Sequence, residues 1–135
     1  MKQPEPEVRA LASGWLGKAR VDLLVCDSLL AQGADLLEAV AFHCQQAAEK
    51  ALKALLVWHQ VEFPKTHDIQ RLLDLLADVD SGVVGLVADA AGLTPFGVDY
   101  RYPGEYPPVR RETASMAVTV ARRVYEAVAG RVGAE

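Results

Sequence analysis

The sequence predicts an all-α protein that folds as an up-and-down bundle of four or five helices. Apolar residues recur at intervals of three and four along most of the chain, which is the spacing of one face of an α-helix. Sustained alternation of apolar and polar residues is missing, and no Asn-Gly or Asp-Gly pair marks a hairpin turn. Long helices joined by short turns bury their apolar stripes best against one another, so a bundle is expected.

The first two helices are expected at residues 8–30 and 36–59. Gly33 is placed to end the first helix with a left-handed cap, and Asp35 with Glu38 has the form of a capping box for the second. The second segment is rich in Ala, Leu, Gln, Glu and Lys and contains no Gly or Pro, so it should form about six turns. The apolar stripe of the first helix is Val8, Leu11, Ala12, Trp15, Ala19, Leu23, Cys26 and Leu30.

Three further helices are expected in the second half of the chain. Pro64 breaks the second helix, and Thr66 offers an N-cap hydroxyl for a short third helix. Ser81 can cap a weaker fourth helix over residues 83–93, and residues 94–108, rich in Pro and Gly, form a long loop before the last helix. The last helix is expected to bury Val109, Thr113, Met116, Val120, Val124 and Val128. The bundle core is expected around Trp15, Leu23, Leu52, Leu56, Leu73, Val120 and Val124.

Length and composition restrict the class of protein. The chain has 135 residues, of which 51% are hydrophobic and 24% charged, and this fits a single domain over residues 1–135 with its core at about 8–130. No apolar run approaches the roughly 18 residues of a membrane span, and the N-terminus lacks the apolar region of a signal peptide. We therefore expect a cytoplasmic protein without membrane contact. Cys26 and Cys44 have no zinc or redox spacing and are expected to be buried thiols.

The net charge of −4 is distributed unevenly. Residues 66–99 carry one positive and six negative side chains, whereas residues 100–135 carry six positive and four negative ones. A global basic field that would attract nucleic acid is therefore absent, and any anion must bind to a local cluster of Lys and Arg.

A first candidate site lies in the second predicted helix. Gln46, Glu49, Lys50 and Lys53 fall along one side of that helix, together with His43. They form either a solvated face with a Glu49–Lys53 ion pair, or an anion site in which the two lysines hold a phosphate and a neighbouring amide or carboxylate bonds a base or sugar. The spacing alone does not choose between these interpretations.

A second candidate site is the segment Lys65-Thr66-His67-Asp68 at the start of the third predicted helix. Free backbone N–H groups and the helix dipole favour an anion at this position. Helix capping explains Thr66 and Asp68 without any function. It leaves Lys65 and His67 unexplained, and the imidazole of His67 suits either a phosphate contact or a proton transfer.

A third candidate site is the long loop, where Asp99-Tyr100-Arg101-Tyr102-Pro103 is followed by Tyr106. Tyrosine rings can stack on a base, and the planar guanidinium of Arg101 suits a phosphate. Alternatively, the tyrosines pack the loop onto the bundle and Arg101 pairs with an acidic neighbour.

Motifs for metal binding and covalent catalysis are missing from the sequence. It contains no His-x-x-x-His or Cys-x-x-Cys pair, no serine in a Gly-x-Ser-x-Gly turn and no Gly-rich phosphate loop. We therefore assign no catalytic residue, no metal and no cofactor.

Four blocks of the sequence, in this order, resemble the HEPN domain, a small all-helical domain for which nucleotide binding has been proposed. The resemblance spans about residues 13–128. It implies a four- or five-helix up-and-down bundle, a homodimer, and pairing with a minimal nucleotidyltransferase, sometimes as a toxin–antitoxin system. The blocks are Trp15-Leu16-x-x-Ala19-x-x-Asp22-Leu23, Phe42-His43-x-x-Gln46-Ala47-Ala48-Glu49-Lys50-Ala51-Leu52-Lys53-Ala54-Leu55, Lys65-Thr66-His67-Asp68-Ile69 with Leu72-Leu73, and Arg101-Tyr102-Pro103.

The chain departs from one property of this family. Many HEPN proteins are metal-independent ribonucleases with an Arg and a His separated by four to six residues, but after Arg101 the possible His positions hold Tyr106, Pro107 and Pro108. The resemblance is thus to the branch that carries Arg-Tyr-Pro. It favours a non-catalytic nucleotide- or nucleic-acid-binding partner of a nucleotidyltransferase, with a ribonuclease toxin and a structural dimerisation module as the alternatives.

The expected binding site combines the three candidate clusters in one groove that takes a nucleotide or an RNA end. In the competing account the cations point in different directions and pair with separate acids, which residues 66–99 could supply. The expected binding residues are Lys50, Lys53, His67, Arg101 and Tyr102, with Gln46, Glu49 and Asp68 as supporting residues.

Overall fold

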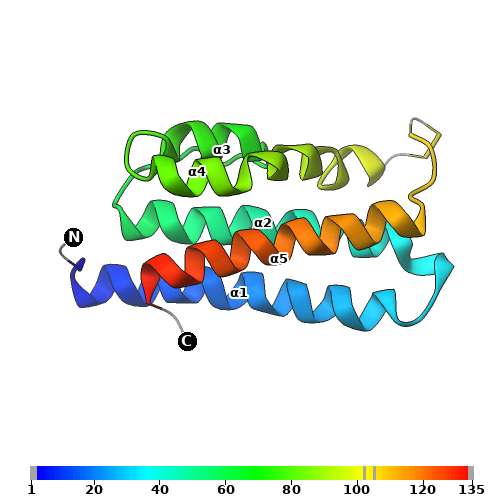
Figure 1. The fold of residues 1–135 in the computed structure, drawn as a ribbon, viewed down its shortest axis with the longest axis horizontal. Helices are drawn as coiled ribbons and strands as arrows, with labels where there is room; N and C mark the ends of the chain where they lie inside the picture. Colours follow the sequence, from blue (N-terminus) through cyan, green and yellow to red (C-terminus); the bar gives the residue numbers. More distant parts are fainter. Residues whose placement is uncertain (1–2, 102, 105, 134–135) are drawn as a thin grey trace.

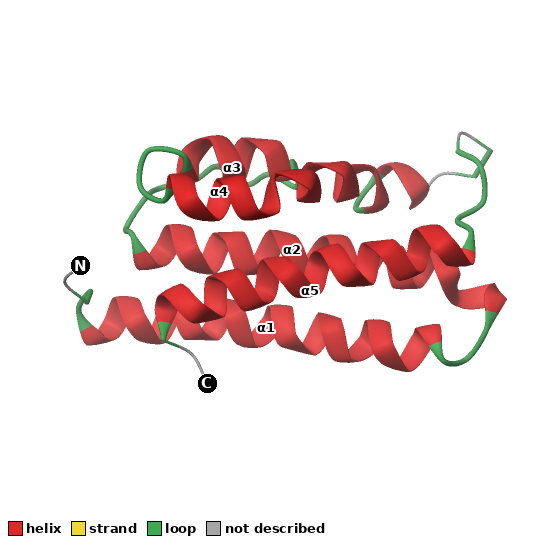
Figure 2. Cartoon of the chain, in the orientation of Figure 1, coloured by secondary structure: helices red, strands yellow, loops and turns green. Residues whose placement is uncertain are grey.

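The computed structural model describes residues 3–101, 103–104 and 106–133, and all regular structure in these ranges is helical (Figures 1 and 2). The sequence-based prediction of an all-α bundle is confirmed. Within the described ranges, no helix is long and apolar enough to cross a membrane. The elements in chain order are α1 (Pro6–Leu30), the 3₁₀ segment η1 (Ala34–Leu36), α2 (Leu37–Trp58), α3 (Ile69–Leu76), α4 (Ser81–Val87), the 3₁₀ segments η2 (Ala88–Phe96) and η3 (Asp99–Arg101), and α5 (Arg111–Val132).

Three long helices, α1, α2 and α5, lie side by side, and α1 runs antiparallel to the other two (Figure 1). The shorter elements α3 and η2 pack against another side of α2, and α4 packs against α3 and α5, so α2 lies in the centre of the molecule. Both ends of the described chain lie at the same end of the bundle, where α2 and α5 also end. This central position explains why fourteen residues of α2 are buried.

The core is built from small residues where the long helices meet. Many of the buried residues of α2 and α5 are alanines, and their small side chains let the helix backbones approach closely. The expected core residues Leu23, Leu52, Leu56, Leu73, Val120 and Val124 are buried. Trp15 is only partly buried at the edge of the core: its ring lies against Lys53 of α2, and the residue also lines a hollow on the outer side of α1.

Two residues expected to face the core point outward instead. Leu11 is 58% exposed and Met116 is 68% exposed. On α5 the buried stripe runs through Ala117 and Ala121, whose small side chains fit the close contact with α2, and Met116 falls beside that stripe. On α1 the buried stripe passes through Ala12, so Leu11 lies on a second, outer face of the helix.

The caps of α3 and α4 differ from the sequence-based expectation. The carboxylate of Asp68, not the hydroxyl of Thr66, accepts the N-cap hydrogen bond of α3, while Thr66 accepts from the backbone N–H of Asp68. Asp80, not Ser81, caps α4 by accepting from the backbone N–H of Val83 at 2.9 Å. A carboxylate gains more than a hydroxyl from the positive end of a helix dipole, which favours Asp at both positions.

The junction between α1 and α2 is a tight turn rather than a capping box. Ala31 is the C-cap of α1 in right-handed conformation, and Gly33 has φ +128° and ψ −173°, outside the left-handed helical region. Residues 34–36 form η1, and neither Asp35 nor Glu38 makes a capping hydrogen bond, because η1 leads directly into α2. The expected fourth helix also ends earlier, at Val87, where the chain tightens into η2.

Candidate functional site

Four polar residues form a network between α2 and the segment before α3, which we call the Glu49 cluster (Gln45, Glu49, Lys53 and His67). Gln45, Glu49 and Lys53 are buried, whereas the side chain of His67 is 59% exposed. The carboxylate of Glu49 accepts from Lys53 Nζ at 2.8 Å and from Gln45 Nε2 at 3.0 Å, and it lies 2.9 Å from Nδ1 of His67. Gln45 Nε2 also donates to the backbone carbonyl of His67. Glu49 and Lys53 are 3% and 7% exposed, so this ion pair belongs to the interior and not to a solvated face.

Two aromatic rings complete the surroundings of Lys53. Its Nζ lies 5.6 Å from the ring centroid of Trp15 and 5.7 Å from that of Phe63, and the two rings meet edge to face. The ring faces and the carboxylate of Glu49 together replace the water that the ammonium loses on burial. The ammonium group of Lys53 is therefore held in the protein interior by its contacts with Glu49 and the two rings.

The environment of Glu49 lowers the pKa of its carboxyl group below the ordinary value of 4.5. Burial acts in the opposite direction, because it penalises the charged form. The hydrogen bonds from Lys53, Gln45 and His67 outweigh burial, so Glu49 is ionised at neutral pH.

A second cluster, the Asp22 cluster (Asp22, His43 and Lys50), links α1 to α2. The buried carboxylate of Asp22 lies 2.9 Å from Nδ1 of His43 and 2.8 Å from Nζ of Lys50. The two α2 side chains lie seven residues apart, about two turns, so one carboxylate from α1 can reach both. Both remain partly exposed, and they can therefore contact a ligand while Asp22 positions them.

An aromatic pocket lies next to the Asp22 cluster. It has a volume of about 280 Å³ and is lined by Glu38, Ala39, Phe42, Phe96 and Tyr100. The ring of Phe42 meets that of His43 edge to face at 5.2 Å, which joins the pocket to the Asp22 cluster. The ring centroid of Tyr100 lies 5.1 Å from that of Phe96. The ring of Tyr100 also stacks on that of Tyr106, with the two centroids 4.8 Å apart.

Close packing of η2 and the following Gly97 against α2 connects the pocket with the Glu49 cluster. Gly97, which follows η2, lies so close to Gln45 that a Cβ at this position would be 2.7 Å from Cδ of that side chain. Gln45 cannot move aside freely, because it is fully buried and bonded to Glu49, to the His67 carbonyl and to Gln46. The backbone conformation of Gly97 is ordinary, so the close approach explains the glycine.

The structure brings only part of the expected site together. Glu49, Lys53 and His67 meet in one cluster, but Lys50 bonds to Asp22 instead. The competing account expected the acids within residues 66–99, yet they come from α1 and from α2 itself. Asp68 caps α3, and Gln46 lies between the two clusters and donates to Gln45 at 2.7 Å.

The loop part of the expected site is only partly described. Arg101 ends η3, directly after Tyr100 of the aromatic pocket. Tyr102 and the side chain of Arg101 lie outside the described residues.

The sequence analysis did not assign three residues of the site: Asp22, Gln45 and Trp15. A signal for Asp22 exists: it is an acid next to the buried stripe of α1, three residues after Ala19. Gln45 carried no such signal, because Gln46 beside it has the same chemistry and only packing decides which of the two is buried.

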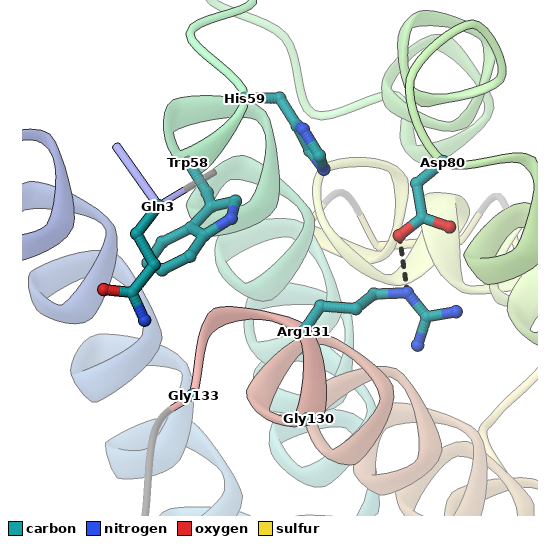
Figure 3. Close-up of a pocket in the computed structure, with 7 residues that line it drawn as sticks. All are labelled: Gln3, Trp58, His59, Asp80, Gly130, Arg131 and Gly133. Atoms are coloured by element: carbon teal, nitrogen blue, oxygen red, sulfur yellow. Dashed lines mark hydrogen bonds and ion pairs between the residues drawn. The ribbon is translucent and has the colours of Figure 1, made fainter. Parts of the chain in front are cut away.

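A second pocket, of about 290 Å³, lies at the end of the bundle where α2 and α5 terminate (Figure 3). The side chains of Trp58 and His59 face Asp80 and Arg131 across it, and an ion pair between the latter two ties the end of α5 to the start of α4. The guanidinium of Arg131 also donates to the carbonyl of Ala127. The charged side chains of this pocket are thus used in contacts that hold the helices together.

The two thiols lie in contact inside the bundle. Sγ of Cys26 and Sγ of Cys44 are 3.4 Å apart, and both residues are fully buried, as expected. The hydrogen bond between them and burial raise the pKa of the Cys44 thiol. In the described part of the chain, no three His, Cys, Asp or Glu side chains are grouped as metal ligands.

Comparisons with known proteins agree with this architecture. The crystal structure of the protein TT1696 from Thermus thermophilus superposes with a TM-score of 0.71 at 31% sequence identity, over 89% of this chain and 97% of that one. A search of curated proteins found no match. The family model of the HEPN domain matches residues 12–131. The chain therefore belongs to the HEPN domain family.

Proposed function

We propose that this HEPN protein binds a nucleotide or the end of an RNA and acts as the non-catalytic partner of a minimal nucleotidyltransferase, in a pair of the toxin–antitoxin type. We further propose that it does so as a homodimer. Membership of the HEPN family supports the general class, and the geometry around α2 supports the binding role.

The observation that carries the proposal is the contact between the aromatic pocket and the Asp22 cluster. The rings of Phe42, Phe96 and Tyr100 line the pocket and can pack against a base, and the edge-to-face contact of Phe42 with His43 places polar groups at the border of the same pocket. Lys50 and His43 are partly exposed and can contact a phosphate.

This proposal changes the roles expected for the two lysines. Lys50 is the phosphate contact, whereas Lys53 has its charge satisfied by Glu49 and lies between two rings. The Glu49 cluster then holds the segment before α3 against α2 and fixes the wall of the site. Arg101 and Tyr102 keep the phosphate- and base-binding roles that the chemistry of their side chains favours.

The expected affinity is weak. Each charge-assisted contact contributes about 1.5–3 kcal/mol, and the entropy cost of association offsets much of this, which leaves micromolar to millimolar binding. The acidic side chain of Glu38 in the pocket opposes a phosphate directly above it and favours a base with an amino group at that place.

Calorimetric titration with ATP and with a short oligoribonucleotide tests the proposal. Lys50→Ala should weaken phosphate binding at least about tenfold, and Tyr100→Ala should reduce the preference among bases more than the affinity for phosphate. Arg123→Ala is the matched control, because this residue lies in α5 and pairs with Asp89 on the surface. Absence of wild-type binding at millimolar ligand, or equal binding by all variants, contradicts the proposed function.

A second candidate function is metal-independent RNA cleavage. It is favoured by two carboxylate–imidazole pairs, Asp22 with His43 and Glu49 with His67, since such pairs can orient an imidazole for proton transfer. Purified protein that cleaves RNA in the presence of a chelator, with loss of activity in His43→Ala or His67→Ala, would establish this function in place of the first.

A further inference from the structure

Helix α1 carries two separate seams of residues at alternating spacings of three and four. The inner seam is buried against α2 and α5, as the bundle requires. The outer seam has the same spacing and lies on the exposed side, with Val25 half-buried. Such spacing is typical of a helix that packs against another helix along its length. The inner seam is Ala12, Leu16, Ala19, Leu23 and Cys26, and the outer seam is Glu7, Leu11, Gly14, Lys18, Val21 and Val25.

The outer seam contains a hollow of the shape that receives a side chain from a facing helix. This hollow, of about 310 Å³, is lined by Leu11, Gly14, Trp15 and Lys18. These residues stand at positions i, i+3, i+4 and i+7, which are the four corners of a hole in knobs-into-holes packing. Gly14 leaves the hollow open, because nothing lies within 4 Å of the place where its Cβ would be.

Charges on the same seam select the occupant and its direction. Glu7 lies in the first turn of α1 and Lys18 lies three turns later, and neither forms an ion pair with any residue in the described ranges. If a second copy of α1 runs antiparallel across this face, Glu7 of each copy meets Lys18 of the other. In the same register Leu11 stands opposite Gly14, where the hollow is.

We infer that the outer seam of α1 is an interface with a second copy of this chain, in which the two α1 helices pack antiparallel. Leu11 of each copy fills the hollow between Leu11 and Lys18 of the other, and two Glu7–Lys18 ion pairs close the interface at its ends. The inference rests on the homodimer of the proposed function and adds the surface, the direction and the register.

The neighbouring register, one heptad along, is less favourable. It would place Leu11 opposite Val21 and would leave Glu7 facing Val25, without a cation. A polar residue on a helix seam commonly fixes the register in this way, since a mismatch leaves its charge against an apolar side chain.

The interface adjoins the candidate site through one residue. Trp15 lines the hollow, and its ring also lies over Nζ of Lys53 in the Glu49 cluster. A second α1 packed on this face therefore covers the outer side of the ring that borders the buried lysine.

Charge reversal tests the pairing. Glu7→Lys and Lys18→Glu should each weaken the dimer at least about tenfold in analytical ultracentrifugation, because each replaces two attractions by two repulsions. An equimolar mixture of these two variants should form a heterodimer, since its pairs are again opposite in sign. Circular dichroism of each variant checks that the monomer remains folded.

Disulfide trapping tests the register. A Glu7→Cys/Lys18→Cys double variant should give a covalent dimer under mild oxidation, while Glu7→Cys/Val25→Cys should not. Within one helix the two introduced thiols of the first variant are about 16 Å apart, too far to bond to each other. The native thiols are buried and remain the same in both variants.

Filling the hollow provides a third readout. Gly14→Leu should weaken the dimer, whereas Gly85→Leu, at an equally open glycine of α4, should leave it unchanged. A dimer that is insensitive to charge reversal and gives no Glu7→Cys/Lys18→Cys cross-link overturns the α1 interface but leaves the homodimer standing. A monomeric wild type at micromolar concentration overturns both, and a seam that binds only another protein overturns the self-pairing.

Discussion

Separating the two charges of the buried Glu49–Lys53 pair should cost a large part of the stability of the fold. Glu49→Gln leaves the ammonium of Lys53 between two rings without a counter-charge, and Lys53→Met leaves the carboxylate with Gln45 and His67 as its described donors. Removal of one partner of a buried pair typically costs about 3–5 kcal/mol. We expect a loss of stability of about 3 kcal/mol for each single variant, at the lower end of this range, because both side chains keep a small exposed fraction.

The double variant Glu49→Gln/Lys53→Met removes both charges and should be destabilised by only about 1–2 kcal/mol, which gives a coupling energy of about 4–5 kcal/mol. The free energy of unfolding from urea titrations, followed by far-UV circular dichroism, measures this cycle. Arg123 and Asp89 form the control pair, since their side chains are 42% and 55% exposed and their coupling should stay below about 1 kcal/mol. Additive effects at positions 49 and 53, or a coupling no larger than that of the control pair, would refute the reasoning.

Three further predictions concern the same region of α2. The pKa of Glu49 is lowered in the folded state, so its ionisation stabilises the fold above its ordinary value of 4.5 and this contribution is lost as the pH falls through the lowered value. Urea titrations between about pH 3 and 6 should therefore show a steeper loss of stability in the wild type than in Glu49→Gln, and parallel curves would contradict this. Gly97→Ala should lower the free energy of unfolding by about 1–3 kcal/mol, because the new methyl group collides with Gln45. Adding Gln45→Ala to the same chain should recover part of this loss. Unchanged thermal unfolding of Gly97→Ala would count against the packing argument. Gln60 follows the C-cap of α2 and has φ +58°, so Gln60→Gly should raise the stability by up to about 1 kcal/mol while Gln60→Ala should not, a difference that calorimetry can detect.

The sequence by itself determined the helices and most of the core. Apolar spacing located α2 within one residue at each end, since a long run of good helix formers without Gly or Pro leaves little choice of backbone. Where the pattern allowed two faces, as for Leu11 on α1 and Met116 on α5, the prediction was wrong, because periodicity shows that a stripe exists but not which neighbour it meets.

The candidate site depended on information that is absent from local spacing. Sequence reasoning identified Lys50, Lys53, Glu49 and His67 as a polar group on or near α2, and the structure divides these residues between two carboxylates. One of those carboxylates, Asp22, lies on α1, and no helical spacing within α2 can reveal it.

Only the tertiary structure decided which charges are buried and which remain open to a ligand. Lys50 and Lys53 are three residues apart and chemically identical, yet one is partly exposed and the other is enclosed by Trp15, Phe63 and Glu49. The physical reason is that burial and ion pairing are set by side chains that are distant in sequence and come together only when the helices pack.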